Sequence, residues 1–345
     1  MTESLREPAH GPVPDPVRRA LLIGAGAAAA GAHAAPRAPQ PIFVLNSQDA
    51  DVSVIDPVSF AVTRRIAVGK EPHHLYLTPD EKGLIVANAA GNSLTFIDPA
   101  TGAVQRQVPN IVDPYHLRFS PDMQWFVTAA NRLDHVDLYR WQPQAPKPFA
   151  LVKRIEAPKT PSHLYIDTRS IVCYVSMQDS DELLAIDLTT QAPRWKVKTG
   201  RMPADVFLTA DDRHLLVGLT GDKVVEVYDV SNPARPAQLM RRITTGAGAH
   251  AFRARGDKRH VFVSNRVANT ISLIDTQTWG VVSELPAPGG PDCMEMLADG
   301  RTLLVTSRWA RKLTFVDIER RQVVRQVAVG RSPHGVWTLD HAPRA

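Results

Sequence analysis

Side chains that can bind a transition metal recur at a regular spacing of about forty-two residues in this chain. Each stands third in a short turn that usually begins with proline. The third residues of the seven turns are His74, His116, His163, Asp205, His250, Cys293 and, without a metal-binding side chain, Gly335. Six of the ten histidines after residue 34 lie in these turns, whereas random placement would put about one there. Imidazole, thiolate and carboxylate groups are ligands of zinc and copper. The spacing therefore predicts a copper or zinc site wherever the fold brings the turns together.

Two further histidines stand one residue earlier in their turns. His73 directly precedes His74, and His334 directly follows the proline of the last turn. A ring of seven positions is too wide for one ion to touch every member, so we expect three or four ligands away from the centre, or more than one ion. The structural alternative is that each imidazole hydrogen-bonds to the backbone of its own turn, a role that would repeat with the turn.

The turns separate repeated units of four short strands. After each turn comes an apolar run such as 74–77, then a second strand such as 85–88, a third that ends in aspartate such as 94–98, and a fourth such as 104–108. These runs are rich in β-branched residues and are bounded by Asp, Gly, Pro and Asn, as strands are. Four antiparallel strands in about 42 residues are typical of a β-propeller blade. The sequence therefore predicts an all-β, seven-bladed propeller of four-stranded antiparallel blades over residues 41–340.

The two ends of the chain complete each other. Residues 41–68 supply the second, third and fourth strands of a blade, and residues 334–338 supply a first strand. Together they form one mixed blade, which closes the ring and removes the exposed sheet edges that invite aggregation. In a closed ring the seven turns, and therefore their histidines, converge on one mouth of the central channel.

The first 34 residues are expected to be an export signal. Paired arginines, Arg18 and Arg19, precede a weakly apolar Ala/Gly-rich run that ends in a small-x-small cleavage site. This pattern resembles a twin-arginine signal, with general secretion as the alternative. We therefore predict a periplasmic protein that consists of the propeller, a leader (1–34), a linker (35–40) and a short tail (341–345).

Bulk properties argue against several classes of protein. No segment after the leader has about 18 consecutive apolar residues, so no membrane span is expected. The two cysteines, Cys173 and Cys293, are too few for a disulfide-stapled fold, and the apolar neighbours of Cys173 indicate a core residue. The net charge of +5 permits anionic partners without requiring them.

The second and third strands and the turns resemble those of the YVTN repeat proteins, also called YncE-like propellers. Runs such as Ile85–Asn88 and Val52–Asp56 carry the resemblance, together with the Pro-His turns, over about residues 41–340. That family includes binding proteins, surface proteins and relatives of lactonases, so the resemblance implies a fold more than a function. The adjacent pair His73 and His74 also resembles the histidines by which the propeller of nitrous oxide reductase holds copper around its axis.

Three functions are compatible with these residues. The first, which we favour, is an exported carrier, sensor or assembly factor that binds copper or zinc, with a periplasmic protein as a further candidate partner. The second is a lactonase-like or lyase-like enzyme in which Glu295 works with His250 or His334, and Arg118 supports them. The third is a scaffold that binds a protein, the cell wall or, less favoured, single-stranded nucleic acid. No catalytic residue is assigned.

Overall fold

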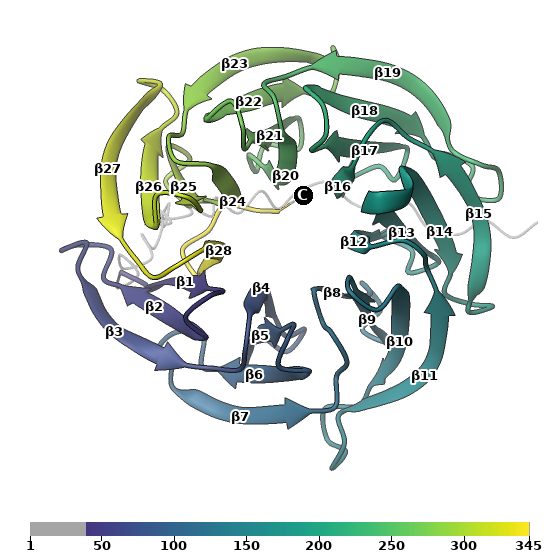
Figure 1. Cartoon of the computed structure of the whole chain (residues 1–345), viewed down its shortest axis with the longest axis horizontal. Coiled ribbons are helices and arrows are strands. Elements are labelled where there is room, and N and C mark those ends of the chain that lie inside the picture. Colours follow the sequence, from purple (N-terminus) through teal and green to yellow (C-terminus); the bar gives the residue numbers. More distant parts are fainter. Residues whose placement is uncertain (1–38, 345) are drawn as a thin grey trace, which may run out of the picture. The chain divides into compact units, whose positions relative to one another are not determined.

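Seven four-stranded antiparallel sheets stand around a central channel in the computed structural model, which describes residues 39–344 (Figure 1). The predicted seven-bladed propeller is therefore confirmed. The predicted leader (1–34) and residues 35–38 of the predicted linker lie outside the described residues. In the described part, η1 (Gln178–Ser180) is a single turn of 3-10 helix, and no helix is long and apolar enough to cross a bilayer.

Each blade begins with an inner strand that lines the channel and ends with an outer strand at the rim. The inner strands are β4 (Pro72–Leu77), β8 (His116–Phe119), β12 (Pro161–Ile166), β16 (Pro203–Leu208), β20 (Ala249–Ala254), β24 (Pro291–Met296) and β28 (Pro333–Thr338). The second strands are β1 (Ile42–Asn46), β5 (Leu84–Asn88), β9 (Trp125–Ala130), β13 (Val172–Met177), β17 (His214–Leu219), β21 (His260–Asn265) and β25 (Thr302–Ser307). The third strands are β2 (Asp51–Ile55), β6 (Ser93–Ile97), β10 (His135–Trp141), β14 (Glu182–Asp187), β18 (Val224–Asp229), β22 (Thr270–Asp275) and β26 (Lys312–Asp317). The outer strands are β3 (Val62–Ala67), β7 (Val104–Pro109), β11 (Phe149–Glu156), β15 (Ala192–Lys198), β19 (Gln238–Thr244), β23 (Gly280–Pro286) and β27 (Gln322–Ala328).

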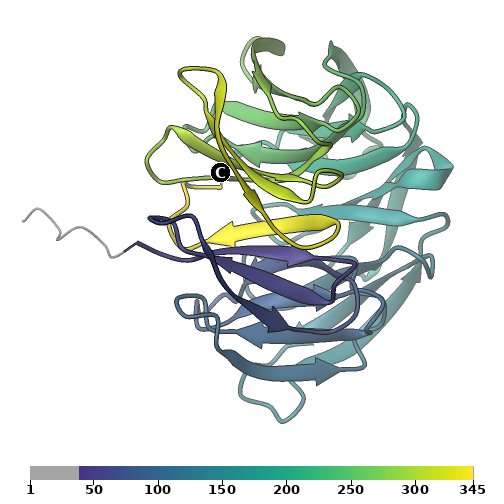
Figure 2. The same ribbon diagram turned by 60° about the vertical axis from the view of Figure 1, so that its left-hand side comes forward.

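The ring is closed by a blade built from both ends of the described chain. β28 pairs with β1 in antiparallel register, so that Trp337 lies opposite Phe43 and Thr338 opposite Ile42. Figure 2 shows β28, in yellow, beside the purple strands β1, β2 and β3. The rings of Phe43 and Trp337 are buried and stack with their centroids 6.2 Å apart. The predicted mixed blade is confirmed.

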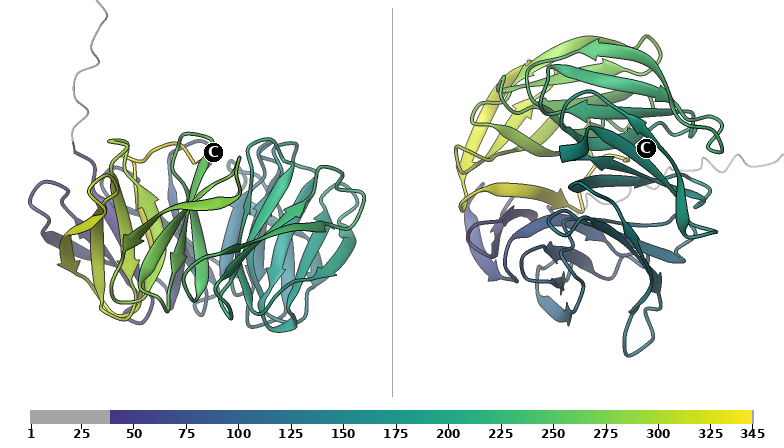
Figure 3. Two further views of the ribbon diagram at one scale, coloured as in Figure 1. Left: turned by 90° about the horizontal axis from the view of Figure 1, so that it is seen from above. Right: turned by 45° about the vertical axis from the view of Figure 1, so that its right-hand side comes forward.

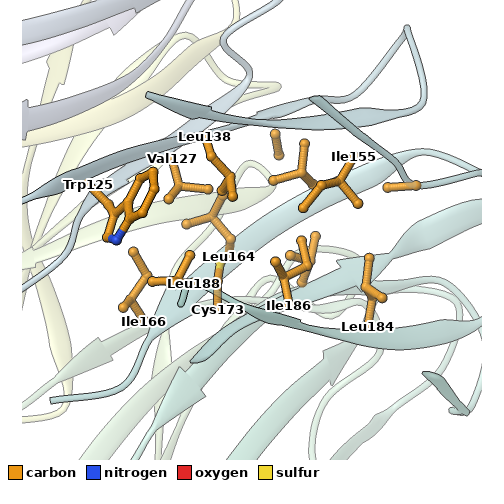
Figure 4. Packing of buried hydrophobic residues seen from close by; sticks show 14 of the residues in the cluster. Trp125, Val127, Leu138, Ile155, Leu164, Ile166, Cys173, Leu184, Ile186 and Leu188 are labelled. Carbon is orange, nitrogen blue, oxygen red and sulfur yellow. The ribbon is translucent and has the colours of Figure 1, made fainter. Parts of the chain in front are cut away.

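Apolar side chains pack between neighbouring blades. The cluster in Figure 4 joins the blade of β9 and β10 to the blade of β12, β13 and β14, and it buries residues such as Val127, Leu164 and Ile186. Cys173 belongs to this cluster, as predicted, and the thiols of Cys173 and Cys293 are both free. Each blade therefore depends on its neighbours to bury its faces, as the units of repeat proteins do.

The aspartates that end the third strands hold turns. Asp98 accepts hydrogen bonds from the N–H groups of Ala100 at 3.0 Å and Thr101 at 2.7 Å. Asp317 accepts the equivalent bonds from Glu319 and Arg320. Aspartate favours such turns because its short side chain reaches the backbone two and three residues further on. The recurring aspartate thus has a structural role in these blades.

A β-bulge at the start of the inner strands turns two consecutive residues toward the channel. In β4, for example, the pairing shifts between Pro72 and His74, and the same shift occurs in β12, β16, β20, β24 and β28. The residues directly after the turn proline form a first layer across the channel: His73, Tyr115, Ser162, Ala204, His250, Asp292 and His334. The residues that follow them form a second layer: His74, His116, His163, Asp205, Ala251, Cys293 and Gly335.

The strand pairing places His250 in the first layer. Ala249 holds the pairing position that proline holds in most other inner strands. His250 follows it directly, and Ala251 therefore occupies the second layer. The prediction that His250 is equivalent to His74 is wrong, because Gly248 and Ala249 replace the proline that marks the register elsewhere.

The end of the chain lies across the mouth of the channel that is opposite the turns. His341 forms an isolated bridge with Leu297, and the N–H of Ala342 donates to the carbonyl of Met296 at 2.8 Å. The C-terminal end lies over the channel in Figure 1 and at one face of the ring in the left view of Figure 3. The inner strands end at this face, so residues 341–344 lie over that mouth.

Candidate metal centre

Three imidazoles from neighbouring inner strands meet inside the channel. His74, His116 and His163 come from β4, β8 and β12, and their ring centroids are 4.5 to 4.9 Å apart. One nitrogen of each ring lies within 4.8 Å of the nitrogens of the other two. Zinc–nitrogen bonds are about 2.0–2.1 Å long, so an ion between the rings would draw them slightly together. The three residues, which we call the three-histidine group, were each predicted as ligands from the sequence.

Hydrogen bonds at Nδ1 orient these rings. Nδ1 of His74 donates to the carbonyl oxygen of Tyr115 at 2.7 Å, which leaves the lone pair on Nε2 for another ligand. Nδ1 of His163 lies 3.0 Å from Oγ of Ser162. Nδ1 of His116 accepts a long hydrogen bond of 3.3 Å from a backbone N–H of β12. An ion on Nε2 of His116 would place the proton on Nδ1, so this contact would be lost or the ring would turn over.

A second group of donors lies around His334 in the first layer. Its Nδ1 donates to Oδ2 of Asp292 at 2.9 Å, and its buried Nε2 has no hydrogen-bond partner among residues 39–344. The ring of His73 lies 3.7 Å away between centroids, and one nitrogen each of His73, His74 and His334 lie within 4.8 Å of one another. A carboxylate that accepts from one ring nitrogen and leaves the other bare is the usual support of a metal-binding histidine. His74 belongs to both groups.

Asp292 is the buried acid of the first layer. Its Oδ1 lies 3.0 Å from Nε2 of His250 and 2.6 Å from the guanidinium of Arg266, and its Oδ2 lies 3.1 Å from Arg308. Burial alone would raise the pKa of Asp292, but the charges of Arg266, His334 and His250 hold that pKa well below its ordinary value of 3.8. The channel therefore contains a permanent negative charge beside the histidines.

The imidazoles of the three-histidine group are neutral at neutral pH. Burial, followed by nearby positive groups, lowers the pKa of His74, His116 and His163 well below the ordinary value of 6.5. Burial also lowers the pKa of His250, to about 4. The neutral imidazole is the form that binds a metal ion, so no proton needs to leave before an ion can bind.

A cavity of about 240 Å³ gives access to the three-histidine group. His74, His116 and His163 form part of its wall, and it extends along the inner strands to Arg344 in the chain end. Among the residues that line it, none belongs to the first layer, which closes the channel on the side of the turns. Its other polar and aromatic lining residues are Tyr76, Arg118, Tyr165, Asp205, Phe207, Phe252, Arg253, Cys293 and Glu295.

Two predicted ligands, Asp205 and Cys293, lie outside the three-histidine group. The carboxylate of Asp205 accepts a backbone hydrogen bond from Phe252 at 2.8 Å, and burial raises its pKa to about 6. Sγ of Cys293 lies 3.8 Å from Nδ1 of His334 and groups with His334 and Asp292. Burial raises the pKa of the Cys293 thiol well above 9.0, so the thiol is protonated until a ligand displaces the proton.

The acid that the enzymatic alternative requires is already paired. Glu295 accepts a hydrogen bond from Arg253 at 2.6 Å and forms an ion pair with Arg344. Both carboxylate oxygens of Glu295 are therefore engaged by guanidinium groups, so neither is free to reach a substrate proton without breaking an ion pair. His334, its suggested partner, lies in the first layer outside the cavity that Glu295 lines. Arg118 does line that cavity.

Asp292 and Tyr115 belong to the site but are absent from the residues predicted as ligands. Both directly follow a turn proline, as His73 and His334 do. That position is the signal that could have found them, because the bulge directs all first-layer side chains into the same channel. An aspartate after proline is otherwise common in turns.

One family model, described as a YNCE-like beta-propeller, matches residues 18–344 of the sequence. The chain belongs to the YNCE-like β-propeller family. This match confirms the resemblance carried by its strands and turns. No curated protein matches the sequence of this YNCE-like propeller.

Solved structures of low sequence identity share the propeller fold. The periplasmic gluconolactonase PpgL of Pseudomonas aeruginosa aligns with a TM-score of 0.73 and 19% identity, over 88% of this chain and 99% of that one. The hydrazine synthase of Kuenenia stuttgartiensis aligns with 0.63 and 20%, over 76% and 88%. The dihydro-heme d1 dehydrogenase NirN, in complex with DHE, aligns with 0.65 and 17%, over 86% and 75%. At these identities the likeness shows the fold alone.

Proposed function

We propose that this YNCE-like propeller binds one transition metal ion, zinc or copper, at His74, His116 and His163. The observation that carries the proposal is that three neutral imidazoles converge on the wall of a cavity. Three protein nitrogens and one open position leave a bound ion able to meet a further ligand. The protein would act as a carrier, a sensor or an assembly factor for the ion.

The first layer supports this proposal. The buried Nε2 of His334 has no hydrogen-bond partner in the described part of the chain, which costs free energy unless a ligand compensates the lost hydration. The rings of His73 and His334 lie 4.7 and 5.0 Å from that of His74, so further nitrogen donors adjoin one of the three proposed ligands. A cavity of about 240 Å³ is smaller than the roughly 300–1,000 Å³ of pockets for drug-sized ligands. It therefore suits an ion with a small molecule better than a haem-sized group.

Elemental analysis tests the metal site. Chelator-treated protein, incubated with zinc or with copper and then desalted, should retain at least one equivalent of metal per chain. His116→Asn and His163→Asn should each lower the retained metal severalfold, because each removes a nitrogen donor. The bound ion should also raise the melting temperature of the wild type, since a ligand at 100 times its Kd stabilises a fold by about 2.7 kcal/mol.

His214→Asn provides the matched control. His214 begins β17, and its ring lies 5.0 Å from the ring of Trp279, outside the cavity. This variant should retain metal as the wild type does. A wild type that retains no metal, or channel variants that retain as much as His214→Asn, would refute the proposed site. Circular dichroism on the same samples shows that the variants compared are folded.

The proposal includes export to the periplasm by the twin-arginine route. It is supported by Arg18 and Arg19, which stand ahead of the Ala/Gly-rich run. Cell fractionation examines this point independently of metal binding. Full-length chain in the cytoplasm alone, with no shortened form in the periplasm, would contradict it.

A further inference from the structure

Arg118 presents a half-buried guanidinium group to the cavity. It stands on β8 two residues beyond His116, and it lines the same cavity as the three-histidine group. Its Nε donates to the carbonyl oxygen of Leu164 at 2.9 Å, and its guanidinium carbon lies 3.8 Å from the ring centre of Tyr165. Within residues 39–344, no carboxylate forms an ion pair with this guanidinium.

The other charged groups that line the cavity already have partners. Arg253 donates to Glu295 at 2.6 Å, and Arg344 pairs with the second oxygen of the same carboxylate. The carboxylate of Asp205 accepts two backbone hydrogen bonds of 2.8 Å. The charge of Arg118 is thus left without a carboxylate at hydrogen-bond distance among the described residues. The charge of Asp205 acts on Arg118 without a hydrogen bond, so the guanidinium keeps terminal N–H groups that an anionic ligand could accept from.

Aromatic rings form much of the remaining wall. Tyr76, Tyr165, Phe207 and Phe252 line the cavity, whose volume of about 240 Å³ corresponds to roughly eight water molecules. We propose that the cavity binds a small organic carboxylate, with its charged end on Arg118 and its carbon chain against these rings. The proposal goes beyond the metal site, because the carboxylate shares the cavity with the ion but does not require it.

The donors around Arg118 fit a carboxylate. The planar guanidinium offers parallel N–H groups that match two carboxylate oxygens, and Nε is already used by the carbonyl of Leu164. The ligand would therefore bind at the terminal nitrogens. The hydroxyl of Tyr76, on the wall of the same cavity, acts on this guanidinium and has an O–H that can donate to the ligand.

Isothermal titration of the chelator-treated full chain tests this inference, with butyrate as the probe and the neutral butyramide as its counterpart. We expect saturable binding of butyrate and at least tenfold weaker binding of butyramide. R118Q should lose at least tenfold in butyrate affinity, because it removes the charge that the carboxylate meets. R118K keeps the charge but not the planar fork, so its affinity should lie between the two.

R140Q is the matched control. The guanidinium carbon of Arg140 also lies over an aromatic ring, 3.7 Å from the centre of Trp125, but Arg140 does not line the cavity. This variant should bind butyrate as the wild type does. If R118Q fails to fold, the butyrate affinity of folded R118K is compared with that of R140Q instead. A weaker affinity of R118K supports binding by the guanidinium of Arg118, and an equal affinity overturns it.

Equal affinity for butyrate and butyramide, or butyrate binding that R118Q leaves unchanged, would overturn the inference. Absence of saturable binding by both chelated and zinc-loaded protein would also overturn it. Metal content measured on the same samples separates the two proposals. If butyrate binds but no metal is retained, the carboxylate site is supported and the metal site fails. If zinc is retained but butyrate does not bind, the metal site is supported and the carboxylate site fails.

Discussion

Burial of the channel histidines couples the stability of the fold to pH. Burial lowers the pKa of six of them from 6.5, namely His73, His74, His116, His163, His250 and His334. Near pH 6.5 the unfolded chain takes up protons that the folded chain does not bind, so acid favours unfolding. The six neutral histidines make their full contribution to the stability of the fold above about pH 6.5. It is lost as the pH falls toward the folded-state pKa, which for His250 is about 4.

We expect the free energy of unfolding of the metal-free protein to decrease steadily between pH 7 and pH 5. Each histidine that is protonated only in the unfolded chain contributes a slope of about 1.4 kcal/mol per pH unit. Urea unfolding at pH 7, 6 and 5 measures the slope. His163→Asn should reduce it by up to one such contribution. A free energy of unfolding that stays constant over this range would contradict the expectation.

At the scale of elements, the chain end covers the cavity. Arg253 donates to the carbonyl oxygens of Ala342 at 2.7 Å and Pro343 at 3.0 Å, and Arg344 pairs with Glu295 at the same mouth. These contacts tie residues 341–344 to β20 and β24. The chain end therefore lies on the path between the cavity and solvent.

Deletion of residues 341–345 should speed the release of bound zinc to a chelator severalfold, because it uncovers the mouth. The loss of stability should be about 2 kcal/mol, since a hydrogen bond to a charged group contributes about 1.5–3 kcal/mol and these contacts are partly exposed. Stopped-flow measurement with a chromogenic chelator gives the release rate. Arg344→Ala removes only one ion pair, so it should change the rate in the same direction but less. A release rate that the deletion leaves unaltered would count against a covering role.

The strands of each blade could be predicted, but the buried polar groups that support them could not. Asn46 in β1 donates to Oγ of Ser53 at 2.9 Å and accepts from the N–H of Gly330 at 2.9 Å. In the blade of β16 to β19, Leu219 stands in place of this asparagine. Glu226 there accepts the equivalent hydrogen bond, from the N–H of Gly200 at 3.0 Å. Glu226 belongs to the neighbouring strand, so this exchange of roles becomes visible only once the strands are in register.

The same limit explains which parts of the site were predictable. His74, His116 and His163 follow prolines at the repeat spacing, so the sequence alone aligns them. His250 lacks the proline that marks its register, and only the pairing of β20 with β21 assigns its layer. Asp292 resembles an ordinary turn residue until the bulge turns it into the channel. Period and residue type are local signals, whereas the layers depend on backbone pairing.

At the scale of the whole molecule, one blade decides whether the ring closes. β28 joins strands from the other end of the described chain, and Trp337 is buried there against Phe43. Since every blade buries its faces against its neighbours, loss of this joint would expose two blades at once. The three-histidine group would also lose the enclosure that its neighbours provide.

Trp337→Ala should therefore lower the free energy of unfolding by about 3–5 kcal/mol, the usual cost of truncating a buried tryptophan. Trp309→Ala serves for comparison, because Trp309 is 58% exposed, and its effect should stay within about 1 kcal/mol. Urea unfolding of both variants provides the measurement. Similar losses of unfolding free energy in the two variants would mean that Trp337 in the closing blade contributes no more to stability than an exposed tryptophan.

The first layer of side chains closes the channel on the side of the turns, so the cavity opens at the face where the inner strands end. A ligand of this cavity would therefore enter and leave by the same mouth, the one over which residues 341–344 lie. A protein bound to that face would cover the cavity, whereas a protein bound to the opposite face would leave its mouth open. Under the proposed metal-binding function, any protein that delivers or removes the ion would therefore have to approach the face where residues 341–344 lie.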